Sequence, residues 1–124
     1  MIGRIDDKHD NNNYIYLIGS DKISSDLHRI SEEVNAKKTK LELDYTYNDE
    51  FDPNRFYYRS DHYNFAKNGI PVIFYFSGIH DDYHKPTDDV EKIDFEKIEK
   101  TTRFVFYTAW EIANRSKKLN RNEK

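Results

Sequence analysis

The sequence contains no cysteine among its 124 residues. A disulfide framework and a cysteine-based zinc site are therefore both excluded. Any metal ion would have to be held by histidine, aspartate or glutamate side chains.

The sequence also lacks an excess of basic residues and a long apolar run. Its formal net charge is −3 at pH 7, whereas a nucleic-acid surface normally shows as a basic excess. No apolar run approaches the roughly 20 residues that span a bilayer, and residues 1–20 lack the pattern of a signal peptide. We therefore expect no nucleic-acid partner and no membrane span.

Aromatic residues are abundant and are expected to carry the core. The chain has 10 tyrosines and 8 phenylalanines, while 35% of its residues are charged. A free-standing domain of this length would remove roughly two thirds of its unfolded surface from water, so a packed core is feasible. The length fits one domain or a part of a larger one.

Three segments have the apolar pattern of β-strands. Residues 14–18 form an apolar run closed by Gly19 and Ser20, which indicates a buried strand. Residues 41–47 alternate apolar and polar side chains, which predicts a strand with one covered face. Residues 71–76 show no polar alternation after an initial proline, which favours a strand buried on both faces.

Two segments have the spacing of amphipathic helices. Leu27, Ile30 and Val34 predict a helix over about residues 24–36, with Ser24 or Ser25 as its cap. Asp94 can cap a long helix near the end of the chain. Its predicted apolar face is formed by Phe95, Ile98, Thr102, Val105, Ala109 and Ile112.

A short helix is predicted between Ser60 or Asp61 at its cap and Gly69 at its end. Strands and helices thus alternate, which predicts an α/β fold: a three-layer sandwich with a mostly parallel or mixed sheet and helices on both faces. In such sheets ligands gather beyond the carboxyl ends of strands, and the loop after Phe76 is such a place.

Two polar clusters could carry chemistry. Residues 58–62 read Tyr-Arg-Ser-Asp-His, and residues 78–88 read Gly-Ile-His-Asp-Asp-Tyr-His-Lys-Pro-Thr-Asp. His80 and His84, mixed with carboxylates, could ligate a divalent metal ion. From the spacing alone, a loop that is merely solvated is at least as good an alternative.

Residues 58–94 resemble the C-terminal signature of the di-zinc aminopeptidases, metallopeptidase family twenty-eight, which also includes the glutaminyl cyclases. Residues 1–4 resemble the family segment that follows a metal-binding aspartate, and residues 14–27 fit a bacterial branch. The resemblance implies that residues 1–115 are the C-terminal portion of a zinc aminopeptidase catalytic domain, and we expect residues 116–124 to be a basic flexible tail. Relatives of this type are often secreted or periplasmic.

The resemblance also implies roles for single residues. His84 matches the last zinc ligand, and Tyr83 matches a position that steadies the oxyanion of the tetrahedral intermediate, although a packed aromatic is an equal alternative. Asp61 matches a carboxylate that orients other groups near the site. His62 would pack or hydrogen-bond in support, and Asp88 would stabilise the turn or the ligand. Three further residues could line the substrate entrance, although a merely solvated loop is the favoured interpretation: His80, Asp81 and Asp82.

The family holds two zinc ions with a histidine, a bridging aspartate, a glutamate, a second aspartate and the final histidine, and another glutamate serves as general base. Only the final histidine falls in this chain, so we expect a truncated or mis-started fragment. One histidine is too few for a catalytic zinc site, and the fragment should be inactive alone. It should also associate with itself through an uncovered sheet edge. The complete enzyme would take peptides with a free N-terminus.

Two other functions remain open. A glutaminyl cyclase would use the same site for rearrangement, but the Asp-Tyr-His and Ser-Asp-His motifs favour the peptidase. A non-catalytic binding module could reuse the fold, and it would lack the ligand residues upstream of this chain.

Overall fold

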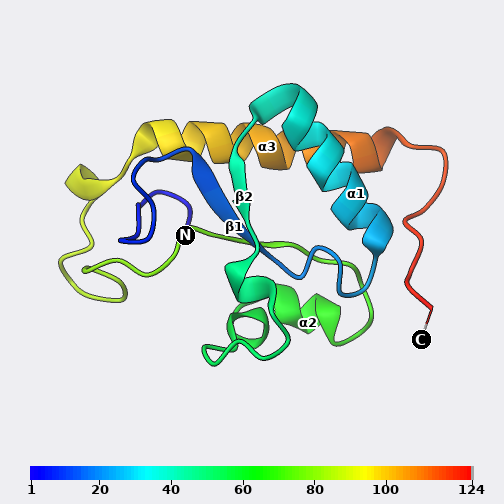
Figure 1. Ribbon diagram of the computed structural model, residues 1–124, viewed down its shortest axis with the longest axis horizontal. Coiled ribbons are helices and arrows are strands. Elements are labelled where there is room, and N and C mark those ends of the chain that lie inside the picture. Colours follow the sequence, from blue (N-terminus) through cyan, green and yellow to red (C-terminus); the bar gives the residue numbers. More distant parts are fainter. Residues whose placement is uncertain (124) are drawn as a thin grey trace.

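A small mixed sheet forms the centre of the protein. The computed structural model describes residues 1–123. Its strands are β1 (Tyr14–Ile18), β2 (Glu42–Asp44) and β3 (Phe74–Phe76), in the order β2-β1-β3. The central strand β1 runs parallel to β2 and antiparallel to β3 (Figure 1). The predicted mixed α/β architecture is confirmed, and the three-layer sandwich stays a prediction.

Strand β1 is buried along its whole length, as the apolar run predicts. Its side chains are at most 1% exposed and alternate between two hydrophobic clusters. The tyrosine cluster contains Tyr14, Tyr16, Ile18, Tyr47, Phe56 and Phe76. The aliphatic cluster contains Ile15, Leu17, Ile30, Val34, Leu41 and Phe104. A strand with both faces covered has no polar alternation, which accounts for the sequence pattern.

Helix α1 (Ser25–Val34) begins where the sequence predicts. Ser24 has extended backbone angles, and its hydroxyl accepts a hydrogen bond from the Leu27 amide at 3.1 Å, so it is the N-cap. The helix continues into a π-helical turn, Asn35–Thr39, which ends at left-handed Lys40. Leu27, Ile30 and Val34 are all buried, so the predicted apolar face is confirmed.

Helix α3 (Phe95–Asn114) is capped by Asp94, whose side chain accepts a hydrogen bond from the Lys97 amide at 3.0 Å. The predicted apolar face is wrong at Phe95, Thr102 and Ala109, which are exposed, whereas Ile112 packs against the aliphatic cluster as predicted. The face that packs inward consists of Lys97, Thr101, Phe104 and Thr108. Figure 1 shows α3 beside α1, on the opposite side of the strands from α2 (His62–Ala66).

Strand β2 is shorter than predicted. The Asp44 carboxylate accepts hydrogen bonds from the backbone amide and hydroxyl of Thr46, at 2.9 and 2.6 Å, and a 3₁₀ turn follows at Thr46–Asn48. This turn sends Tyr47 into the tyrosine cluster, whereas Tyr45 packs against the aliphatic cluster. The predicted common face for these two tyrosines is therefore wrong.

Helix α2 is also shorter than predicted, and its cap differs. Asp61 precedes the helix with helical backbone angles and makes no capping hydrogen bond, so its predicted capping role is wrong. Gly69 has a φ of +74°, a conformation that favours glycine, and the chain leaves the helix there as predicted. A 3₁₀ turn, Phe56–Tyr58, precedes the helix.

Strand β3 covers only the second half of the predicted segment. Phe76 is fully buried, whereas Phe74 and Tyr75 are half-buried. The predicted burial on both faces is therefore confirmed only at the last residue of β3, Phe76. After a loop, a 3₁₀ turn at Val90–Lys92 leads to α3.

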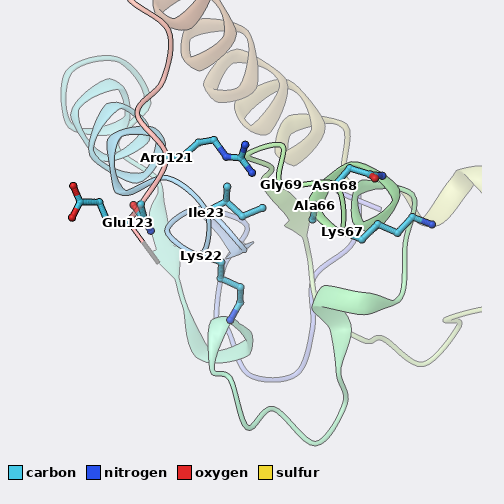
Figure 2. A pocket seen from close by; sticks show the side chains of 9 residues that line it. Lys22, Ile23, Ala66, Lys67, Asn68, Gly69, Arg121 and Glu123 are labelled. Carbon is cyan, nitrogen blue, oxygen red and sulfur yellow. The ribbon is translucent and has the colours of Figure 1, made fainter.

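The segment after α3 packs back onto the start of α1. The Asn122 amide donates to the Ile23 carbonyl at 2.8 Å, and the Asn122 side chain accepts a hydrogen bond from the Ser25 amide at 2.8 Å. A pocket of about 820 Å³ lies beside this C-terminal segment. Figure 2 shows Arg121 next to Gly69 in this pocket. Flexibility of this basic tail stays a prediction. Among residues 1–123, no helix has the length and apolar character needed to cross a membrane.

Candidate functional site

The predicted site lies in the loop that leaves the carboxyl end of β3, residues 77–89, here called the His84 loop. Its first residue is fixed by the Ser77 amide, which donates to the Met1 carbonyl at 3.1 Å. Gly78 follows with a φ of +94°, and a Cβ there would lie 2.3 Å from Oδ2 of Asp6. Only glycine fits this close approach, so the N-terminal segment and the His84 loop are packed tightly together.

His84 is exposed and sits in a left-handed conformation with a φ of +55°. This backbone region is uncommon for residues other than glycine, and such outliers gather at functional sites. The imidazole lies against the ring of Tyr83, with ring centroids 4.0 Å apart. The structure therefore presents the predicted metal ligand on the surface and not inside the core.

Tyr83 is half-buried and packs against the tyrosine cluster. Its ring meets Phe76 edge-on at 6.4 Å and His80 edge-on at 6.1 Å. This packing supports the structural role that the sequence left open for Tyr83. Its predicted role at the oxyanion stays a prediction.

A network of ion pairs braces the His84 loop. Arg4 bonds to Asp82 at 2.7 Å and to Asp88 at 2.6 Å, and Lys92 bonds to Asp82 at 2.9 Å. The hydrogen bonds from Arg4, Thr87 and Lys92 hold the pKa of Asp82 well below its usual range. Asp82 is thus an ion-paired anchor rather than a merely solvated side chain.

His80 is largely withdrawn from water, with a side chain that is 7% exposed. Its Nδ1 atom accepts a hydrogen bond from the Asp82 amide at 3.2 Å. Burial and the charge of Arg4 lower the pKa of His80 from its ordinary value. His80 is therefore neutral near pH 7, and Nδ1 is occupied by the loop itself.

A polar cavity of about 550 Å³ opens between the N-terminal segment and the His84 loop. The predicted entrance residues His80, Asp81 and Asp82 all line it. Positive charge comes from Arg4 and Lys8 on the other wall. Charges of both signs thus surround a space that could admit a polar substrate.

Asp61 and His62 belong to α2. Asp61 is exposed, and its orienting role stays a prediction. The Nε2 atom of His62 donates to the Tyr57 carbonyl at 2.6 Å, and the ring stacks on Phe74 with centroids 4.6 Å apart. Burial lowers the pKa of His62. These contacts agree with the supporting role expected for His62.

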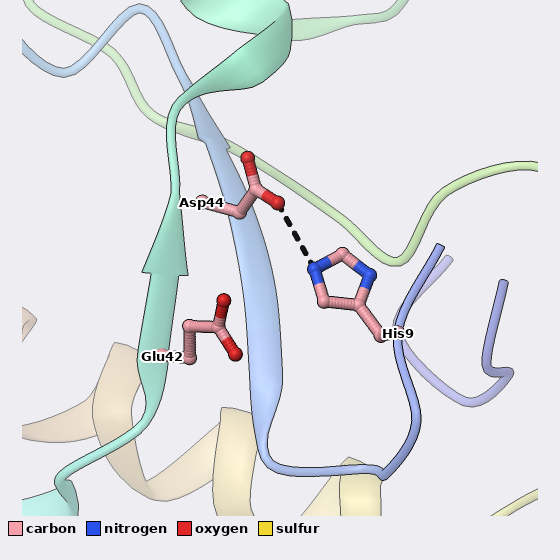
Figure 3. A group of neighbouring side chains, drawn as sticks. All are labelled: His9, Glu42 and Asp44. Carbon is pink, nitrogen blue, oxygen red and sulfur yellow. Dashed lines mark hydrogen bonds and ion pairs between the residues drawn. The ribbon is translucent and has the colours of Figure 1, made fainter. Parts of the chain in front are cut away.

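A second group of potential metal ligands lies on β2 and the N-terminal segment. His9, Glu42 and Asp44 each offer one ligand atom, and these atoms lie within 4.8 Å of one another (Figure 3). The Nε2 atom of His9 is 2.9 Å from Oδ2 of Asp44, and Nδ1 is 2.7 Å from Oδ1 of Asp6. The sequence reasoning missed this group because His9 lies more than thirty positions before Glu42 and Asp44.

A comparison with protein families decides membership. The model of peptidase family M28 matches residues 7–109. The chain belongs to peptidase family M28. Neither the comparison with curated proteins nor that with solved structures gave a match.

All the site residues predicted from the sequence lie within the part that matches the M28 family: Asp61, Tyr83 and His84. The same part contains His9, Glu42 and Asp44. Arg4 and Asp6, which contact the His84 loop, precede the matched range. The family assignment thus covers both groups of side chains.

The residues present do not complete a zinc site at His84. Among residues 1–123, the one group of three potential ligands excludes His84. A catalytic zinc ion normally needs three protein ligands. His84 is therefore suited to donate one ligand atom, and the described residues supply no full coordination set around it.

Proposed function

We propose that this chain is the C-terminal portion of a zinc-dependent aminopeptidase that hydrolyses N-terminal peptide bonds by metal-assisted catalysis. The observation that carries the proposal is the position of His84: exposed, left-handed, and held at the carboxyl end of β3 in a chain of the M28 family. The complete domain would be a three-layer sandwich built on the sheet described here.

Each predicted site residue has a role in this proposal. His84 would donate an imidazole lone pair to a zinc ion without adding charge. Tyr83, anchored by its packing on Phe76, would donate a hydrogen bond from its phenol to the oxyanion. Asp61 would orient groups at the site. The ion pair between Arg4 and Asp82 would fix the backbone of the His84 loop and so keep the side chains of His84 and Tyr83 in position.

We propose further that the chain has no hydrolytic activity on its own. The two zinc ions of the centre would need ligands beyond the single imidazole of His84. The substrates would be peptides with a free N-terminus. Self-association is expected because β2 and β3 are both edge strands of the described sheet.

The DNA sequence on the 5′ side of the Met1 codon tests the assignment. We expect an in-frame aspartate codon directly before Met1, and codons for a histidine, an aspartate and paired glutamates further upstream. A reading frame without these residues would contradict the enzyme and favour a non-catalytic binding module of the same fold.

Activity tests the role of His84. In a chain extended by that upstream sequence, His84→Ala should lower the hydrolysis of leucine p-nitroanilide. Removing a residue that only supports a metal ligand typically lowers activity by roughly 10- to 100-fold. Removing the ligand His84 should lower the rate of hydrolysis by at least this factor. Lys85→Ala is the matched control and should keep full activity. Equal activity in both variants would exclude His84 from the centre.

A further inference from the structure

We propose that His9, Glu42 and Asp44 bind a divalent transition-metal ion, with Asp6 orienting the imidazole of His9. None of these residues takes part in the function proposed for His84, Tyr83 and Asp61. The proposal rests on three features: a fixed imidazole, two carboxylates on one strand, and their convergence within 4.8 Å.

The imidazole of His9 is fixed before any ion binds. The side chain is 7% exposed, and its ring stacks on Tyr14 at 3.5 Å with an interplanar angle of 4°. Tyr16 meets the ring edge-on at 5.2 Å. These contacts prevent the ring from turning, so Nε2 faces β2 in the folded protein (Figure 3).

A buried carboxylate supports His9 from behind. Oδ1 of Asp6 lies 2.7 Å from Nδ1 of His9, and the Asp6 side chain is 2% exposed. Oδ2 of Asp6 accepts a further hydrogen bond from the Tyr16 hydroxyl at 2.6 Å, which fixes the carboxylate in turn. A carboxylate on the far nitrogen of a metal-binding histidine fixes the tautomer and makes the near nitrogen a better ligand.

The two carboxylates come from the same face of β2. Glu42 and Asp44 are two positions apart, so their side chains leave the strand on one side. Strand pairing places them opposite Tyr14 and Tyr16, the two rings that hold His9. The register of the parallel pair therefore brings both carboxylates to the imidazole.

The charges at this point favour a cation. Asp44 bonds to His9, but Figure 3 shows no hydrogen bond or ion pair from Glu42 to either neighbour. The contacts of His9 with Asp6 and Asp44 account for those two acids, whereas Glu42 has no partner among the residues drawn in Figure 3. A divalent ion would instead neutralise Glu42 and Asp44 together, since two like charges this close repel each other.

The donor atoms identify the class of ion. One imidazole nitrogen and two carboxylate oxygens suit zinc, which binds all three donor types at about 2.0–2.2 Å. Magnesium prefers oxygen ligands in octahedral geometry and is disfavoured by the imidazole. Three protein ligands leave coordination positions for water or a substrate group.

Zinc binding to the chain of 124 residues tests the proposal by isothermal titration calorimetry. We expect one ion per chain, bound at least tenfold more tightly than magnesium. Glu42→Gln should weaken zinc binding at least about tenfold, which is the lower end of the effects seen for outer partners of metal ligands. Because Glu42 is exposed, this variant should keep the fold, which far-UV circular dichroism will check.

A control variant separates this site from nonspecific zinc binding. Glu50→Gln replaces another exposed glutamate and should leave zinc binding unchanged. Unchanged binding in Glu42→Gln, or no binding at millimolar zinc, would overturn the inference.

Discussion

Replacing the buried Lys97 should stabilise the protein. This lysine lies in the first turns of α3 and is fully buried. Its ammonium group donates to the Tyr14 carbonyl and lies 3.4 Å from the centre of the Tyr14 ring. Loss of water around the charge nevertheless lowers the pKa of Lys97 to about 8, despite the nearby charges of Asp6 and Asp94.

The pKa shift gives the size of the effect. A fall from the ordinary value of 10.5 to about 8 corresponds to a cost of about 3 kcal/mol for folding with the charge buried. Lys97→Met keeps the length of the side chain but loses the hydrogen bond to Tyr14, which is worth about 1.5–3 kcal/mol because the donor carries a charge. We therefore expect the variant to be about 1 kcal/mol more stable at pH 7.

The dependence on pH provides a second readout. Below pH 8 the lysine is protonated in both states, so the full cost of burial is present. Between pH 8 and about 10 the folded state releases its proton first, and the stability of the natural chain should rise. Above pH 10 ionisation of tyrosines should reverse the rise, because burial raises the pKa of Tyr14, Tyr16 and Tyr45 in the folded state.

Urea unfolding followed by circular dichroism, from pH 6 to pH 10, measures both effects. Lys97→Met should lose the rise between pH 8 and pH 10, and Lys67→Met, a change at an exposed lysine, should keep it. A Lys97→Met chain that is less stable than the natural one at pH 7 would refute the reasoning. The bonds to Tyr14 would then outweigh the burial of the charge.

Three further predictions concern the N-terminal segment, the His84 loop and activity. Gly78→Ala should destabilise the fold by at least about 1–3 kcal/mol in urea unfolding, because its φ is positive and Asp6 blocks a Cβ; a neutral result would show that the loop is free to move. Arg4→Met should speed amide hydrogen exchange in residues 78–88 relative to α1, and unchanged exchange would show that the ion pairs do not brace the loop. The pure chain should not hydrolyse leucine p-nitroanilide with added zinc, and turnover that a chelator abolishes would contradict the inactivity proposed for it.

Local signals in the sequence predicted the starts of α1 and α3 correctly. Ser24 and Asp94 cap their helices because their side chains reach amides only three positions ahead. The run at β1 was recognisable because a central strand with two covered faces needs apolar side chains at every position. These features depend on residues that are close together in the chain, so the spacing of residue types in the sequence predicts them.

Features that depend on distant residues were not predictable in the same way. The inward face of α3 contains Lys97 and Thr101, since Lys97 finds a carbonyl and an aromatic ring on β1. Helical periodicity instead selected Phe95, which is exposed. Tyr47 changes sides because the Asp44 turn interrupts the strand.

The two candidate sites also differ in whether their residues are close together in the sequence. His84 was found through a contiguous motif that resembles a known family. His9, Glu42 and Asp44 have no common motif, and the pairing of β2 with β1 brings them together. The alternation of Glu42 and Asp44 with apolar residues was visible in the sequence, but only the register of the sheet relates these two residues to His9.

The N-terminal segment connects both candidate sites physically. Arg4 holds the His84 loop through Asp82, while Asp6, two residues later, faces Gly78 and bonds to His9. The same carboxylate thus sets the start of one loop and the orientation of the imidazole in the other group. A change in the hydrogen bonds of Asp6 would therefore alter both the His84 loop and the group of His9, even though the two sets of ligands share no residue.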